Sequence, residues 1–296
     1  MQIQHEIQHR TEQIETILRA YLPPEEGFQS RVIEAMRYSF LAGGKRLRPM
    51  LMQETFRMFG GTSDLVEPFM AAIEMIHTYS LIHDDLPAMD NDEYRRGKKT
   101  NHMVYGEAMA ILAGDGLLNF AYETALTALE KEPGNPAVAR ALRVLSQKSG
   151  IFGMVGGQSV DVWTDRDGQV SREQLDFIYR LKTGALLEAS MLIGAILAGA
   201  DETEQQVIAR AAVHVGMAFQ IQDDILDVTG TTEQLGKPTG SDDKNQKATY
   251  VAFEGIEKAA EDVEKYSAQA LTELHSLSVQ NEFLQELIRF LIHREK

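Results

Sequence analysis

Aspartate side chains are concentrated in two stretches of the chain, and both could hold metal ions. The segment SLIHDDLPAMDNDEYRRGK, residues 80–98, places five acidic residues within ten positions. The segment QIQDDILD, residues 220–227, holds three more. Like charges at this density repel one another unless a ligand lies between them. Because the chain has no cysteine, these carboxylates favour a hard cation such as Mg²⁺, which completes its shell with water and substrate phosphates.

The second stretch lies in a helical pattern that has no proline or glycine over residues 217–229. Residues four apart share one face of a helix. Asp223 and Asp227 are therefore predicted to lie one turn apart, with Gln220 one turn earlier on the same side. These side chains should point at a common target.

The first stretch is less regular, since Asp84 and Asp90 are six residues apart and would occupy different faces of an ideal helix. Pro87 disfavours helical geometry at Leu86. We expect the helix to end near Asp85 and the chain to bulge before it brings Asp90 back.

Basic residues follow both acidic stretches, and a diphosphate would explain their presence. Arg95, Arg96 and Lys98 follow the first stretch, and Lys237 follows the second. The alternative is a solvated acidic surface whose basic neighbours are only salt-bridge partners. Two acidic stretches that are each followed by a lysine weaken that alternative.

A third basic site lies in LAGGKRLRPM, residues 41–50. Gly43 and Gly44 allow the backbone to approach a ligand closely. Lys45 and Arg48 are predicted to lie one helical turn apart and to present two cations in one direction. By itself this motif fits a solvated basic loop equally well.

The charge balance limits the kinds of partner that this chain is expected to bind. Its 296 residues carry 44 Asp and Glu against 29 Lys and Arg, a formal net charge of −15. That balance argues against nucleic acid or an anionic membrane as the main partner, because either needs a basic face. The absence of cysteine excludes disulfides and thiolate chemistry.

The elements that must position these residues are predicted to be helices, because nearly every segment has a 3.6-residue period. Residues 1–21 are expected to form an amphipathic helix and not a signal peptide. Residues 185–200 are expected to form a buried core helix, too short to span a bilayer. The expectation is an all-α protein, a single large helical bundle over residues 1–296 with a central active-site cavity, located in the cytoplasm.

Taken together, these motifs resemble those of the trans-isoprenyl diphosphate synthase (polyprenyl synthetase) family, and within it the bacterial farnesyl diphosphate synthases, or geranyltranstransferases. The resemblance covers nearly the whole chain and implies the isoprenoid synthase fold and a homodimer. The matching motifs are GGKRLRP (43–49), EMIHTYSLIHDDLPAMDNDEYRRGK (74–98), GDGLL (114–118), GGQSVD (156–161), KTGALL (182–187) and FQIQDDILD (219–227), followed by Lys237.

The resemblance also implies roles for individual residues. Three Mg²⁺ ions, with Mn²⁺ able to substitute, would grip an allylic diphosphate, and Asp85 would support their ligands. The implied metal ligands are Asp84, Asp90, Asp223, Asp224 and Asp227. The implied contacts of the allylic diphosphate are Arg95, Lys182, Thr183, Gln220 and Lys237. The implied contacts of isopentenyl diphosphate are Gly44, Lys45, Arg48, His77 and Arg96.

The implied reaction is Mg²⁺-dependent condensation of isopentenyl diphosphate with dimethylallyl and geranyl diphosphate. Ionisation, condensation and elimination would give (2E,6E)-farnesyl diphosphate. The alternatives are a geranylgeranyl diphosphate synthase with a deeper pocket, a class I terpene cyclase and a non-catalytic partner subunit of a prenyl synthase. The GGKRLRP motif argues against a cyclase, and the two complete acidic stretches argue against a non-catalytic subunit.

Product length is expected to depend on Tyr79 and Ser80, which lie five and four residues before Asp84. In the family, an aromatic residue five positions before the first aspartate is associated with a stop at fifteen carbons. An ideal helix nevertheless places Tyr79 about 140° around the helix axis from Asp84, so its side chain would not point toward the floor of a pocket below Asp84.

Four further residues are predicted to have structural roles. Gln158 and Asp161, three apart on one helix, are expected to orient the basic residues of the site. His83 is expected to be structural, and Trp163 to lie in the core.

Overall fold

The described part of the chain is almost entirely helical, as the sequence periodicity predicts. The computed structural model describes residues 2–167, 170–230 and 249–292. Within these ranges the strands are limited to one hairpin, β1 (Tyr94–Arg95) and β2 (Lys98–Lys99), which pair antiparallel. Arg96 and Gly97 join them with φ of 54° and 74°, as a two-residue hairpin turn requires.

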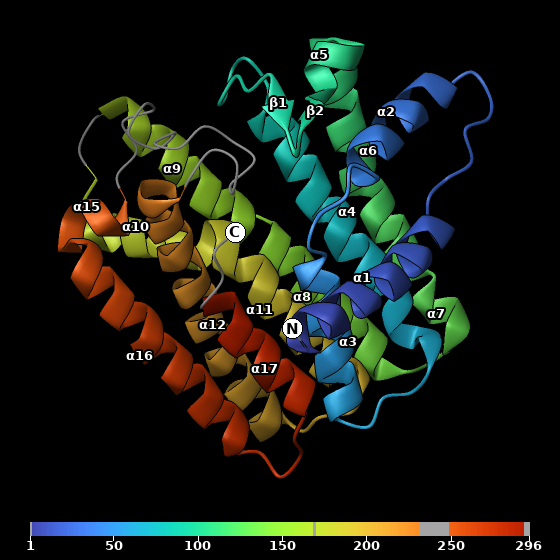
Figure 1. Ribbon diagram of the computed structural model, residues 1–296. Coiled ribbons are helices and arrows are strands. Elements are labelled where there is room, and N and C mark those ends of the chain that lie inside the picture. The colour runs from blue at the N-terminus through green and yellow to red at the C-terminus, as the bar shows by residue number, and fades with distance from the viewer. Residues whose placement is uncertain (1, 168–169, 231–248, 293–296) are drawn as a thin grey trace.

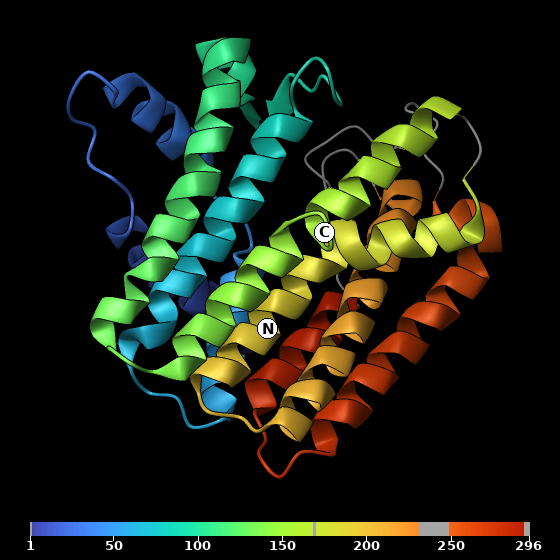
Figure 2. The same ribbon diagram turned by 180° about the vertical axis from the view of Figure 1, so that it is seen from behind.

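Helix α4 (Glu67–Asp84) lies in the right half of the bundle in Figure 1 and is buried along most of its length. Figures 1 and 2 show it together with the other helices in one body. These other helical elements of the described residues are α1 (Gln2–Ala20), α2 (Ser30–Phe40), α3 (Leu47–Met58), η1 (Asp64–Val66), α5 (Asn101–Tyr105), α6 (Glu107–Leu126), α7 (Ala128–Lys131), α8 (Pro136–Ser149), α9 (Met154–Asp167), α10 (Arg172–Ile178), η2 (Tyr179–Thr183), α11 (Gly184–Leu197), α12 (Glu202–Thr229), α15 (Tyr250–Glu254), α16 (Ile256–His275) and α17 (Glu282–Ile292).

The predicted core helix is confirmed as α11, in which all but one residue is buried. Glu188 lies inside this helix and is compensated by an ion pair with Lys148 of α8. A continuous hydrophobic core extends from Ile14 to Leu291. Among the described helices, none combines the length and apolarity that a bilayer crossing requires.

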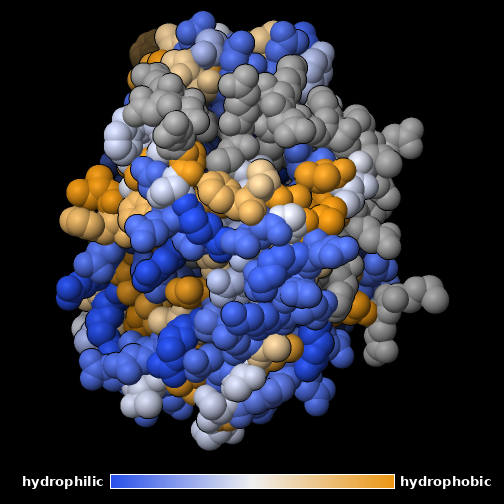
Figure 3. Space-filling view, turned by 90° about the vertical axis from the view of Figure 1, so that its left-hand side faces the viewer, coloured by the Kyte–Doolittle hydropathy of each residue, from blue (hydrophilic) through white to orange (hydrophobic). Residues whose placement is uncertain are grey.

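Helices α12 and α16 run side by side and close one flank of the bundle (Figures 1 and 2). The outward face of this flank is largely hydrophilic (Figure 3), as expected for an amphipathic helix that covers a core. Asp201 caps the start of α12 by accepting the N–H of Glu204, whose side chain bonds back to the Asp201 N–H. This flank holds the second acidic stretch in place.

The end of α4 confirms the predicted bulge. The helix ends at Asp84, and Asp85 is its capping residue. The backbone N–H of Asp90 donates to the carbonyl of Asp84 at 2.9 Å, so the chain turns back on itself over the helix end. Pro87 explains the break, because the residue before a proline avoids helical geometry.

The predicted helical turn from Lys45 to Arg48 is wrong. Arg46 has φ of 48°, in the left-handed region, and α3 begins only at Leu47. Lys45 therefore precedes the helix, whereas Arg48 belongs to its first turn.

The cause of this backbone conformation is a buried ionic cluster. The Arg46 side chain is 0% exposed and donates to Glu15, Glu74 and the carbonyl of Phe40 at 2.6 to 2.7 Å. A buried guanidinium needs all of its partners. These contacts hold the loop before α3 in its left-handed turn.

The expectation that Trp163 lies in the core is also wrong. Its side chain is on α9 and is 59% exposed. The helical pattern of α9 does contain apolar residues, but part of that apolar face borders a cavity and is not packed against another helix.

Candidate active site

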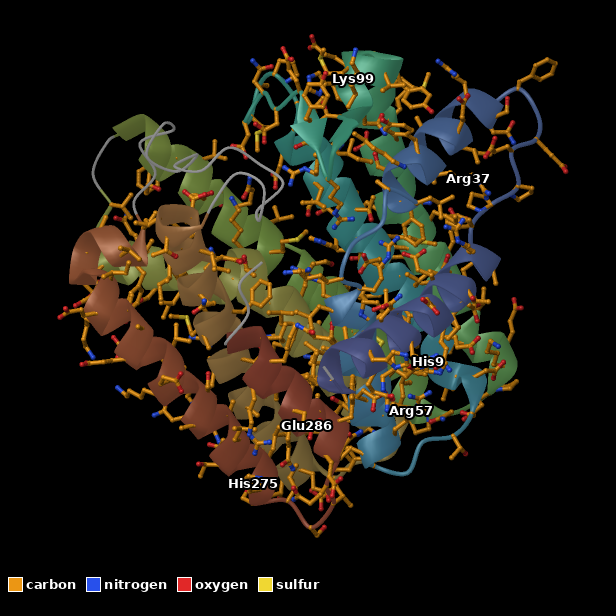
Figure 4. The ribbon with its side chains drawn as sticks, in the orientation of Figure 1. His9, Arg37, Arg57, Lys99, His275 and Glu286 are labelled. Carbon is orange, nitrogen blue, oxygen red and sulfur yellow. The ribbon has the colours of Figure 1, made fainter. Side chains whose placement is uncertain are left out.

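A cavity of about 580 Å³ lies between the C-terminal half of α4 and α9. It lies toward the end of the bundle that carries the hairpin: Lys99 of β2 is at that end, and His275 of α16 is at the opposite end (Figure 4). One wall is apolar and comes from α9, with Met154, Val155 and Val162. The predicted site residues that line the cavity are Arg48, His77, Tyr79, Ser80, Asp84, Lys182 and Thr183.

Asp84 is positioned at this cavity by the last turn of α4 and by a contact from α9. The side-chain N–H of Gln158 donates to the Asp84 carboxylate at 2.7 Å. The expectation that Gln158 orients a basic residue is therefore wrong, because its partner is an aspartate. Gln158 instead fixes the direction of a candidate metal ligand.

Asp85 is turned to Arg95 of the hairpin. The Arg95 guanidinium donates to both Asp85 oxygens at 2.6 to 2.9 Å, in the two-pronged geometry that arginine favours with carboxylates. Burial raises the pKa of Asp85, and the bonds from Arg95 oppose that rise. Asp85 thus holds Arg95 in place, and the role expected for Asp85 in support of the metal ligands stays a prediction.

The second acidic stretch lies near the end of α12, and its three aspartates differ in their surroundings. Asp223 is exposed, whereas Asp224 and Asp227 are 3% and 5% exposed. Asp224 accepts bonds from the Tyr179 hydroxyl, from the Tyr250 backbone N–H at 2.7 Å and from Gln220 at 3.4 Å. Its carboxylate thus accepts bonds from three protein donors, and the metal-ligand role predicted for it stays a prediction.

Arg48 and His77 both belong to the lining of the cavity. Burial lowers the pKa of Arg48 to about 10, with Glu74 and Asp223 raising it and Arg96 lowering it. Burial and four surrounding arginines hold the pKa of His77 well below its usual range, so His77 is neutral at pH 7. The buried Nε of Arg48 has no hydrogen-bond partner in the described part of the chain. An anion would satisfy it.

The glycine loop brings a further arginine to the same place. Arg96 donates to the carbonyl of Gly43, and a Cβ on Gly44 would lie 2.8 Å from the Arg96 guanidinium. Gly44 also has φ of 142°. Both facts favour glycine there. Lys45 lies exposed on this loop. The structure thus brings the predicted isopentenyl diphosphate residues into one neighbourhood.

Lys182 reaches the cavity from the π-helical segment η2. Its ammonium pairs with Asp161 of α9, so Asp161 does orient a basic residue, as predicted. A Cβ on Gly157 would lie only 2.2 Å from the Lys182 backbone nitrogen. Glycine at 157 is therefore needed for α9 to approach η2 this closely. Beside Lys182, the Thr183 hydroxyl donates to Gln220 of α12 at 2.8 Å.

Tyr79 and Ser80 both line the cavity, although Tyr79 lies off the Asp84 face of α4. The Tyr79 ring packs edge-on to His83, with centroids 5.8 Å apart. His83 in turn bonds the carbonyl of Ile111 at 3.1 Å, which supports the structural role expected for it.

The donors offered to a metal fit Mg²⁺. Within the ranges that the structure covers, no three His, Asp or Glu side chains converge tightly enough to hold an ion by themselves. Mg²⁺ does not require such a cage, because it keeps several waters and is completed by substrate phosphates. Arg48 lines the cavity with Asp84, and the charge of Asp223 raises the pKa of Arg48. Lys237 lies outside the described residues.

Two features of the site were not predicted from the sequence. Tyr179, whose hydroxyl contacts Asp224, lies three residues before Lys182, and that spacing could have drawn attention to it. The ionic cluster of Arg46 joins residues 28 and 31 positions apart in the chain, so no local pattern reveals it.

Comparison with known proteins agrees with this geometry. The sequence profile of the family described as "Polyprenyl synthetase" matches residues 29–287. The farnesyl diphosphate synthase of Geobacillus stearothermophilus is 42% identical over 100% of this chain and 99% of its own. The geranylgeranyl diphosphate synthase of Cyanophora paradoxa is 45% identical over 90% of this chain and 87% of its own. The crystal structure of geranylgeranyl pyrophosphate synthetase from Pyrococcus horikoshii superposes with a TM-score of 0.88 at 31% identity, covering 99% of both chains.

Proposed function

The chain belongs to the polyprenyl synthetase family and is a trans-prenyltransferase, and from that premise we propose that it makes (2E,6E)-farnesyl diphosphate. The proposed substrates are isopentenyl diphosphate with dimethylallyl diphosphate and then geranyl diphosphate. The observation that carries this proposal is that an arginine, a neutral histidine and an aspartate line one cavity: Arg48 and His77 are on its wall together with Asp84.

The two diphosphates are assigned to different residues. We place the allylic diphosphate between the acidic stretches, where Lys182 and Arg95 contribute cations. Asp84, Asp90, Asp223 and Asp227 would hold Mg²⁺, whose bound charge would neutralise the departing diphosphate. Isopentenyl diphosphate is assigned to the glycine-loop cluster. The residues of that cluster are Gly44, Lys45, Arg48, His77 and Arg96.

The chain's own groups account for the remaining requirements of the reaction. Ionisation of an allylic C–O bond leaves a carbocation, which must be kept from water. The apolar side chains of α9 exclude water from the cavity wall. The oxygen atoms of Thr183 and Gln220 lie beside Lys182 and offer negative dipoles without a strong nucleophile. Neutral His77 would offer a hydrogen-bond donor to the substrate without adding charge.

The chain length of the product rests on Tyr79. The relatives include both farnesyl and geranylgeranyl synthases at similar identity, so geranylgeranyl diphosphate is the second candidate product. We favour farnesyl diphosphate because a bulky, largely buried ring at Tyr79 borders the cavity and limits the space for a growing chain.

We also propose a homodimer and a single prenyltransferase domain over residues 1–296. Several exposed apolar side chains lie on α5, on α6 and in the turn before α9, and exposed apolar surface commonly marks protein interfaces. The cytoplasmic location stays a prediction. The exposed apolar residues of that surface are Met103, Val104, Ile111, Leu112, Ile151 and Phe152.

Replacing Tyr79 with alanine should shift the main product from farnesyl diphosphate to geranylgeranyl diphosphate or longer. Loss of the ring enlarges the cavity where the prenyl tail grows. The measurement is chromatography of the products formed from labelled isopentenyl diphosphate, Mg²⁺ and each allylic primer, with the unaltered protein run in parallel.

Tyr79→Phe is the matched control, since it keeps the ring and should keep the fifteen-carbon end point. If the unaltered protein consumes no isopentenyl diphosphate with any primer, the proposed reaction is wrong. If Tyr79→Ala still stops at farnesyl diphosphate, another residue sets the length.

A further inference from the structure

The segment that presents Lys182 and Thr183 is a π-helical turn, and its backbone is tightly confined. The N–H of Gly184 donates to the carbonyl of Tyr179, five residues back. Such turns are rare within helices and are frequent at functional sites. A Cβ on Gly216 of α12 would lie 3.0 Å from the Cα of Gly184, so α12 packs directly against the end of the turn. The position of Lys182 therefore depends on how this turn is anchored.

The anchor at the start of the turn is the hydroxyl of Tyr179, a residue that is 5% exposed. This hydroxyl donates to the Asp224 carboxylate and accepts the backbone N–H of Tyr250 at 3.0 Å. The same N–H also donates to Asp224 at 2.7 Å. Three segments thus meet at one buried carboxylate: η2, the end of α12 and the start of α15.

The anchor is connected to the other end of the turn. Gln220 donates to Asp224 at 3.4 Å and accepts the hydroxyl of Thr183 at 2.8 Å. Asp224 therefore contacts the first residue of the turn directly and the last residue through Gln220. Lys182 lies between the two points of attachment.

We propose that Tyr179 is a positioning residue for the allylic diphosphate, and that Asp224 acts as the acceptor that holds Tyr179 and Tyr250 and not as a direct metal ligand. Removing the hydroxyl leaves a buried carboxylate short of one donor and releases the start of the π-helical turn. The ammonium of Lys182 then loses its fixed position, while the glycine-loop cluster on the other side of the cavity is untouched.

This inference rests on the proposed function, and a matched pair of tyrosine variants tests it. Tyr179→Phe removes the anchoring hydroxyl and keeps the ring. Tyr250→Phe is the control: it also removes a buried hydroxyl, which bonds Asp262 at 2.8 Å, but it keeps the backbone N–H that reaches Asp224. Steady-state KM values for geranyl and isopentenyl diphosphate are measured for both, together with calorimetric binding of a non-ionising geranyl thiolodiphosphate in the presence of Mg²⁺.

For Tyr179→Phe we expect about tenfold weaker binding of the analogue and a similar rise in the KM for geranyl diphosphate, the effect of losing one buried hydrogen bond to a charged group. The KM for isopentenyl diphosphate should stay within about twofold. Tyr250→Phe should leave both KM values unchanged. Equal changes for both substrates, equal changes in both variants, or no change in an active Tyr179→Phe would overturn the inference. An inactive unaltered protein would overturn the proposed function instead.

Asp224→Asn separates the anchor from a metal ligand. As an anchor, Asp224 should show the same pattern and size of effect as Tyr179→Phe, and the double variant should lose little more than either single variant. A loss of turnover by several orders of magnitude in Asp224→Asn alone, with an intact circular dichroism spectrum, would show that Asp224 serves the metal ions directly.

Discussion

Replacing Asp84 with alanine is expected to lower turnover by about 10²- to 10³-fold, equivalent to roughly 3 kcal/mol or more of transition-state stabilisation. Asp84 lies on the cavity wall, is aimed by Gln158, and belongs to the acidic stretch that we assign to Mg²⁺. Without it, part of the charge on the departing diphosphate stays uncompensated. Asp90→Ala and Asp223→Ala should show losses of similar size, measured as kcat at saturating concentrations of both substrates.

Two controls make this result specific. Asp64→Ala removes an exposed aspartate that is paired with Lys131 at the far end of α4, and it should leave turnover unchanged. Chelation of divalent metal should abolish the activity of the unaltered protein. Near-normal turnover of Asp84→Ala, with the helical circular dichroism spectrum retained, would contradict the metal assignment.

Arg48→Ala should raise the KM for isopentenyl diphosphate about 100-fold and change the KM for the allylic substrate by less than about threefold. Arg48 lines the cavity, and its buried Nε has no hydrogen-bond partner among the described residues. A diphosphate oxygen would gain a charge-assisted bond there. Lys45→Ala should act in the same direction but more weakly, because Lys45 is exposed. Initial rates over a matrix of both substrate concentrations give the two KM values.

Arg57→Ala is the matched control for Arg48→Ala. Arg57 lies near the other end of α3 (Figure 4) and pairs with Glu54 at 2.7 Å, so its loss should leave both KM values unchanged. An equal rise of both KM values in Arg48→Ala would mean that the two diphosphates do not occupy separate parts of the cavity.

Local features of the fold were predictable wherever a single residue determines the local backbone conformation. Pro87 predicted the end of α4 and the return of Asp90, and the structure has both. The three-residue spacing of Gln158 and Asp161 predicted that both face the site, because residues three apart share a helix face. The predicted partner of Gln158 was wrong, because helical spacing gives the direction of a side chain but does not identify the residue that it meets.

Features that depend on long-range contacts were not predictable in this way. The left-handed backbone at Arg46 follows from ion pairs with Glu15 and Glu74, which come from two other helices. The hydrogen bonds of Asp224 were not predictable for the same reason, because Tyr179 and Tyr250 reach it from distant parts of the chain. The exposure of Trp163 reflects a cavity beside α9, which the periodicity of one helix cannot reveal.

We propose that elongation stops at fifteen carbons because Tyr79 closes the cavity. To test this, the protein is supplied with labelled isopentenyl diphosphate, Mg²⁺ and either farnesyl or geranyl diphosphate as the allylic primer. The rates at which the two primers are converted are then compared. We predict rapid conversion of geranyl diphosphate to farnesyl diphosphate and no measurable incorporation of label with farnesyl diphosphate as the primer. Conversion of farnesyl diphosphate to a twenty-carbon product at a comparable rate would show that Tyr79 does not stop elongation at fifteen carbons. It would identify the chain as a longer-chain synthase.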